Sequence, residues 1–228
     1  MNPQTTLLLW LGLVSGTYAQ SVQVSLEAGT YREQSTGGGQ AGRYGIFVVN
    51  PVNTAYSVGA LARIMTNSPF FFQTGLRHSG HEVGVQFVDQ QPNLPATEDD
   101  FGVYYAGNFL YRFDVPVLAG LGADVSRDVR LEGYGGVTPT LNRYKSTGNY
   151  EGRFMWTAQL IDESLKPVSL NYLYGATVWL RRWGLTVARE GNFRSLNRNV
   201  VYQGAEYPFA TGFRATRVAV SYRFGRLQ

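Results

Sequence analysis

Residues 22–29 read Val-Gln-Val-Ser-Leu-Glu-Ala-Gly, with an apolar side chain at every second position and a polar or small residue between. This period of two places the apolar side chains on one face of an extended strand. Residues 56–64 repeat the pattern, and further segments with strand character lie at 70–78, 109–125, 129–141, 169–180, 183–190 and 215–224. The chain is therefore predicted to be all-β, with eight strands.

The connections between these strands alternate in length. Long connections at residues 31–54, 79–108, 142–168 and 191–214 are separated by short ones at 66–69, 126–128 and 181–182. Transmembrane β-barrels have this order, because their extracellular loops are long and their periplasmic turns are short. The spacing therefore predicts an eight-stranded antiparallel up-and-down β-barrel that spans a membrane.

The composition agrees with a β-rich chain and excludes several other classes. The 228 residues include 27 Gly and 15 Tyr but no Cys, and only 16% are charged. A disulfide-stapled scaffold and a Cys-ligated metal module are therefore excluded. The formal net charge of +4 comes with no basic run that could neutralise a row of phosphates, so we expect no nucleic-acid partner.

The first 19 residues have the features of a secretory signal peptide. An apolar run extends from Leu7 to Val14, and Ala19 stands just before an expected cleavage point at Gln20. We therefore expect a signal peptide at 1–19 and an outer-membrane barrel domain at 20–228. After export, the mature chain is expected in the outer membrane of a Gram-negative cell, in contact with outer-membrane lipid.

The charged residues of the strands fall on the stripe opposite the apolar one, and Arg189 is the exception. If the apolar stripe faces lipid, these charges lie in the lumen, and an eight-stranded barrel has room there only for side chains. Unpaired charges would be costly in that space, so the near balance of six Arg and five acids predicts a paired network that plugs the barrel. Asp124 is expected opposite Arg130. The predicted lumen residues are Glu27, Arg63, Arg77, Arg112, Asp114, Asp124, Arg130, Glu132, Glu190, Arg217 and Arg223.

Aromatic residues gather at both ends of the apolar stripe. Two aromatic belts around a band of Val, Ala and Leu are typical of a lipid-facing surface, because amphipathic rings prefer the headgroup level. The predicted belt near the long loops contains Tyr56, Tyr111, Phe113, Tyr172 and Tyr174, and the belt near the short turns contains Phe70, Phe72, Trp183, Tyr222 and Phe224.

Short motifs resemble those of a known group of proteins. They read FFQTGL at 71–76, LYRFDVPVL at 110–118 followed by LEGYGG at 131–136, and VAVSYRF at 218–224. The chain resembles small outer-membrane β-barrel domain proteins, including PorT-like and OmpX-like porin-family members. The resemblance implies insertion by the outer-membrane assembly machinery and a tolerated bulge or kink at Pro116. It also implies an accessory role in secretion, with a secretion-system or surface partner.

Residues able to support catalysis are few. His78, Ser79, His81 and Glu82 are the cluster that could form a Ser-His-Glu hydrolase or a weak metal site. Adjacency in sequence rarely brings a nucleophile and its base together, however. The acidic residues at 98–100 lack the alternating ligand spacing of a calcium loop. We therefore expect no catalytic residue, no metal site and no cofactor.

Three function classes remain open from the sequence. The preferred one is a non-enzymatic outer-membrane scaffold or interaction protein. The second is a barrel-borne outer-membrane lipid hydrolase that uses the region of His78 and Ser79. The third is a soluble periplasmic barrel that binds a small apolar ligand, although the charged inner stripe disfavours an apolar lumen.

Overall fold

A computed structural model of the chain describes residues 19–41, 44–49, 52–66, 69–89, 102–146, 163–202 and 205–224. The expected signal peptide lies outside these residues except for Ala19. The strands are β1 (Ala19–Ala41), β2 (Tyr44–Val49), β3 (Val52–Thr66), β4 (Phe70–Asp89), β5 (Gly102–Asp114), β6 (Val117–Asp124), β7 (Val129–Ser146), β8 (Val168–Leu180), β9 (Trp183–Asn192), β10 (Val200–Tyr202), β11 (Ala205–Tyr207) and β12 (Ala210–Phe224).

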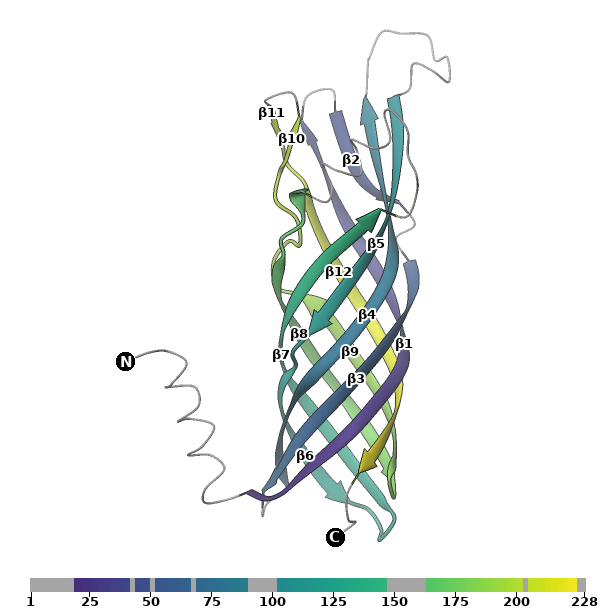
Figure 1. Cartoon of the computed structure of the whole chain (residues 1–228), viewed down its shortest axis with the longest axis vertical. Helices are drawn as coiled ribbons and strands as arrows, with labels where there is room; N and C mark the ends of the chain where they lie inside the picture. Colours follow the sequence, from purple (N-terminus) through teal and green to yellow (C-terminus); the bar gives the residue numbers. More distant parts are fainter. Residues whose placement is uncertain are drawn as a thin grey trace, which may run out of the picture.

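The strands close into a barrel (Figure 1). Neighbouring strands are antiparallel, and the ring closes where β1 pairs with β12. β2 and β3 occupy one position between β1 and β4, because both pair with these two strands at different heights. β5 and β6 likewise share one position between β4 and β7. The ring therefore has eight positions, and the predicted eight-stranded antiparallel barrel is confirmed.

Pro116 interrupts the strand predicted at 109–125 without shifting its register. Asp114 lies opposite Thr140 of β7, and Val117 lies opposite Val137. The two pairs are therefore three residues apart on both strands. A bulge would add one residue to one side. Of the bulge or kink that the family resemblance implies, the bulge is therefore absent, and the proline, which has no N–H to donate, breaks the ladder between β5 and β6.

The predicted loops at 31–54 and 79–108 are largely strand. β1 continues to Ala41 and β4 to Asp89, and they form long hairpins with β2 and β5 at the end opposite the chain termini (Figure 1). The apolar alternation of β1 fades there, because Arg32, Gln34 and Thr36 take the outward positions, so the predicted first strand ends too early. The short turns lie at the same end as the start of β1 and the end of β12.

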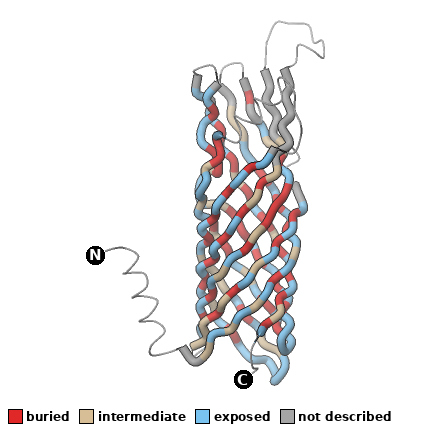
Figure 2. The backbone as a smooth tube through the Cα atoms, viewed as in Figure 1, coloured by how far each residue is buried: buried red, intermediate tan, exposed pale blue. Residues whose placement is uncertain are grey.

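The two faces of the barrel wall differ in the way that a membrane barrel requires. Buried and exposed residues alternate along the strands (Figure 2), and β12 does so over almost its whole length. Val218 and Val220 are about half exposed on the outer face, whereas Arg217 and Ser221 are buried on the inner face. Within the part of the chain that the structure describes, no helix has the length and hydropathy to cross a membrane.

One ion pair joins two of the short turns. Arg181 has a left-handed backbone conformation, with φ of 54°, in the two-residue turn between β8 and β9. Its backbone N–H donates to the carbonyl of Asp128, and its Nε lies 3.0 Å from Asp128 Oδ1. The Asp128 carboxylate raises the pKa of Arg181 by hydrogen bonding, and the exposed pair holds the turn of residues 125–128 against the next one.

Candidate functional site

The charged stripe predicted for the lumen lies inside the barrel. Arg130 is partly buried, and Asp124 is exposed at the turn end. The two side chains pair as the sequence predicts, with Arg130 NH1 3.1 Å from Asp124 Oδ1. The other predicted lumen residues are buried, and these are Glu27, Arg63, Arg77, Arg112, Asp114, Glu132, Glu190, Arg217 and Arg223.

Glu132 is the centre of the cluster nearest the turns. Its carboxylate forms ion pairs with Arg63, with Arg130 at 3.0 Å and with Arg223 at 3.5 Å, and it accepts a hydrogen bond from Trp179 Nε1. The guanidinium of Arg223 also lies 3.9 Å from the centroid of the Trp179 ring. Three cations thus share one fully buried carboxylate, supported by an aromatic ring.

A second cluster lies in the middle of the lumen. Arg217 bridges two acids, with NH1 3.3 Å from Glu27 Oε1 and NH2 2.8 Å from Glu190 Oε2. Arg77 NH1 lies 4.0 Å from the same Glu190 oxygen. These contacts link β1, β4, β9 and β12 across the interior of the barrel.

A third cluster, toward the loop end, includes three residues that are not in the predicted lumen set: Tyr31, Glu33 and His81. Glu33 Oε2 lies 2.9 Å from Arg112 NH2, and Glu33 Oε1 lies 3.0 Å from His81 Nε2. The hydroxyl of Tyr31 is 2.9 Å from His81 Nδ1. With Glu33 added to the predicted five acids, the numbers of acids and arginines in the lumen network become equal.

The sequence contains a pattern that could have placed Glu33 and His81 in the lumen. Glu33 continues the inner stripe of Glu27, and His81 continues that of Arg77, if the alternation is extended past the predicted strand ends.

The structure separates His78 from Ser79, the two residues of the hydrolase considered from the sequence. His78 and Ser79 are neighbours in β4 and therefore point to opposite sides of the wall. The His78 ring lies on the outer face, where it stacks on Phe113 with centroids 4.6 Å apart and its Nε2 is 3.1 Å from the Tyr56 hydroxyl. Ser79 is buried on the inner face. The Ser-His pair considered as an alternative from the sequence does not form between these two residues, because strand alternation separates them.

The residues of both predicted aromatic belts point outward. Near the turns, Trp183 packs edge-on against Tyr222 with centroids 4.9 Å apart, and Tyr222 packs against Phe224 at 5.1 Å. Near the loops, Tyr172 and Tyr174 stack at 6.3 Å. Between the belts, the outer face carries exposed aliphatic side chains that include Val117, Val178, Leu185, Val187 and Val220.

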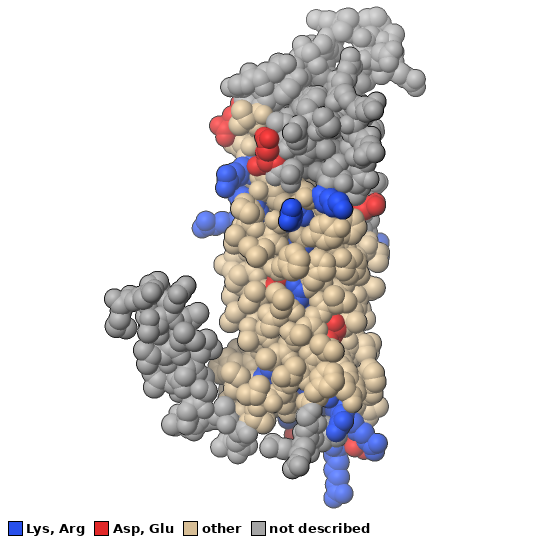
Figure 3. Space-filling view, in the orientation of Figure 1, with Lys and Arg blue, Asp and Glu red and all other residues tan. Residues whose placement is uncertain are grey.

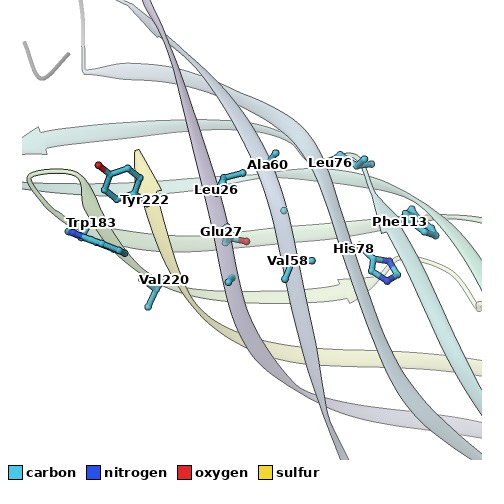
Figure 4. A pocket seen from close by; sticks show the side chains of 12 residues that line it. Leu26, Glu27, Val58, Ala60, Leu76, His78, Phe113, Trp183, Val220 and Tyr222 are labelled. Carbon is cyan, nitrogen blue, oxygen red and sulfur yellow. The ribbon is translucent and has the colours of Figure 1, made fainter. Parts of the chain in front are cut away.

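An apolar groove of about 630 Å³ lies on the outer face (Figure 4). It extends between Trp183 and Tyr222 at one end and His78 and Phe113 at the other, and small residues such as Ala60 line it between. A groove of this shape on a lipid-facing wall suits acyl chains.

The acidic residues at 98–100 lie outside the described residues. Within the described ranges, no group of three or more His, Asp or Glu side chains is arranged to hold a metal ion.

No protein-family model matches the chain, and no curated protein matches it. Solved structures similar to it include OprG from Pseudomonas aeruginosa, an outer-membrane protein with 11% identity and a TM-score of 0.54, over 91% of this chain and 98% of OprG. Neisserial surface protein A has 12% identity and a TM-score of 0.47, over 90% and 100% of the two chains. The outer-membrane protease OmpT from Escherichia coli has 9% identity and a TM-score of 0.43, over 91% and 98%.

The likeness to OprG shows a shared fold, that of an outer-membrane β-barrel. The location in a membrane follows from the two faces of the barrel wall. An exposed apolar band around a buried, ion-paired interior is the reverse of a soluble ligand-binding barrel, and only a lipid bilayer favours it. The protein is therefore an outer-membrane β-barrel.

Proposed function

We propose that this barrel is a non-enzymatic scaffold whose lumen is closed by its own side chains and whose loop-end hairpins engage other molecules. The observation that carries the proposal is the set of buried ion pairs that cross the lumen at three levels, centred on Glu132, Arg217 and Glu33. A filled lumen leaves the hairpins and the outer wall as the surfaces available to partners. The separation of His78 from Ser79 supports a role without hydrolysis.

Conductance tests the closed lumen. The pure protein, reconstituted into planar lipid bilayers, is expected to give no stable, large single-channel steps, because the paired charges leave no continuous water path. Heat-modified migration on a gel of the same sample checks that the barrel is folded. Regular large steps from folded protein would contradict the closed lumen and the scaffold function built on it.

The PorT-like resemblance supports a finer proposal, an accessory role in secretion. The long hairpins β1–β2 and β4–β5 are the surfaces that we expect a secretion-system partner to contact. Affinity purification from detergent-solubilised outer membranes is expected to recover components of a secretion machine with the wild-type protein. The control is a variant in which a short Gly-Ser linker replaces the β10–β11 hairpin, residues 200–207. This hairpin is not one of the two expected to contact the partner, so the control is expected to recover the same components as the wild type. Recovery of assembly machinery and lipid without secretion components would contradict the accessory role.

A further inference from the structure

Three arginines face outward where the apolar band ends on the loop side. Arg32 of β1 and Arg189 of β9 both flank Thr216 of β12, since each is its register partner. Arg214 precedes Thr216 by two residues in β12, on the same outer face, and all three arginines are exposed. Strands are spaced about 5 Å apart, so Arg32 and Arg189 start about 10 Å apart and can reach one small anionic group.

No acidic side chain neutralises this cluster within the described part of the chain. Arg32, Arg189 and Arg214 form no ion pair there, although Arg189 donates to the Thr216 hydroxyl at 2.8 Å. The adjacent acids Glu33 and Glu190 point into the lumen, where they pair with other arginines. Figure 3 shows Lys and Arg side chains, with Asp and Glu side chains among them, at the loop-side edge of a band made mostly of uncharged residues.

A polar pocket of about 440 Å³ adjoins the cluster on the outer surface. Arg194 and Arg214 line it, together with Tyr172, Asn192 and Phe193. Asn192 fixes its wall, because Nδ2 donates to the carbonyl of Arg194 at 2.6 Å and Oδ1 accepts from the backbone N–H of residue 213 at 2.7 Å. These two hydrogen bonds hold the Asn192 side chain in place in the pocket wall.

Aromatic rings form one side of this pocket. Tyr172 and Phe193 pack edge to face with centroids 5.5 Å apart, and the Phe193 side chain is 57% exposed. The Tyr172 ring lies over Gly191, where an added Cβ would come within 2.3 Å of the tyrosine hydroxyl. Glycine at position 191 thus lets the ring lean over β9 toward the arginines of the pocket.

These groups together define the chemistry of a ligand. Guanidinium groups match phosphate oxygens in bidentate geometry. Exposed aromatic rings and amides suit the apolar faces and hydroxyls of a sugar. The wall below is apolar, with Val187 and Val218 about half exposed, so a ligand held here has room for acyl chains alongside the barrel.

We propose that this surface binds the phosphorylated sugar headgroup of a glycolipid in the outer leaflet. The arginines contact phosphate, the rings contact sugar, and the acyl chains lie on the apolar wall. The residues of this glycolipid site are Arg32, Tyr172, Arg189, Asn192, Phe193, Arg194 and Arg214.

The test measures binding of bis-phosphorylated lipid A to the full barrel in neutral detergent micelles. The double variant R189Q/R214Q is expected to bind about tenfold or more weakly, because charge-assisted contacts to phosphate are lost. The matched control R143Q/K145Q removes two exposed cations from the outer face of β7 and is expected to bind as the wild type does. Monophosphoryl lipid A is expected to bind the wild type more weakly than the bis-phosphorylated form.

Two further measurements separate this proposal from its rivals. Phe193→Ala is expected to weaken binding of lipid A but not of phosphatidylglycerol, which has no sugar ring. Glucosamine 1-phosphate, which has no acyl chains, is expected to bind much more weakly than lipid A. Equal losses in R189Q/R214Q and R143Q/K145Q would show unspecific charge attraction and overturn the site. Equal affinity for glucosamine 1-phosphate and lipid A would make the ligand a soluble sugar phosphate instead.

Discussion

Glu132→Gln is expected to lower the free energy of unfolding by about 3–5 kcal/mol, because it leaves buried cations without their carboxylate. The side chain of Glu132 is fully buried and pairs with Arg63, Arg130 and Arg223. A neutral amide keeps the shape of the carboxylate but not its charge. The measurement is urea unfolding of the reconstituted barrel, followed by tryptophan fluorescence, to which Trp179 beside the cluster contributes.

Asp124→Asn is the matched control, because Asp124 also pairs with Arg130. The Asp124 side chain is 69% exposed, so solvent screens the pair and its loss is expected to cost no more than about 1 kcal/mol. The double variant R63Q/E132Q is expected to recover part of the stability lost in E132Q, since one cation is removed together with the acid. Similar losses from E132Q and D124N would show that the lumen is hydrated at the depth of Glu132.

The sequence predicts the barrel well because lipid imposes a strict pattern. Most outward positions of the wall are apolar, so alternation such as Val22, Val24 and Leu26 marks the strand and its orientation together. Past this apolar band β1 continues with polar residues on both faces, such as Glu33 and Ser35 inside and Arg32 and Gln34 outside. The predicted end of the first strand at residue 29 therefore differs from the observed end at Ala41.

The same limit explains what the sequence missed in the lumen. Glu33 and His81 lie just past the predicted strand ends, so they were not assigned to a face, although they pair at 3.0 Å. The outward glycolipid site was missed for a different reason. It depends on Arg32, Arg189 and Arg214 from three strands that register brings together, and register between distant segments cannot be read from spacing alone.

Val220→Arg is expected to destabilise the inserted barrel by about 2–4 kcal/mol, because it places a charge against the middle of the hydrocarbon layer. Val220 is 49% exposed on the outer face of β12, between the two aromatic belts. Leu180→Arg is the depth control. Leu180 is the last residue of β8, beside the turn, and arginine near the interface is expected to cost about 1 kcal/mol or less.

Ser221→Arg is the control for orientation, since Ser221 follows Val220 in the chain but is buried on the inner face. Glu27 is the register partner of Ser221 on β1, so an arginine at 221 lies beside a carboxylate of the lumen network. An arginine at 220 faces lipid and has no such partner. The membrane-inserted fraction after refolding into vesicles, read from heat-modified migration, is expected to fall much further for V220R than for S221R. Equal losses would mean that the apolar stripe does not face lipid, and the inside and outside of the wall would have to be exchanged.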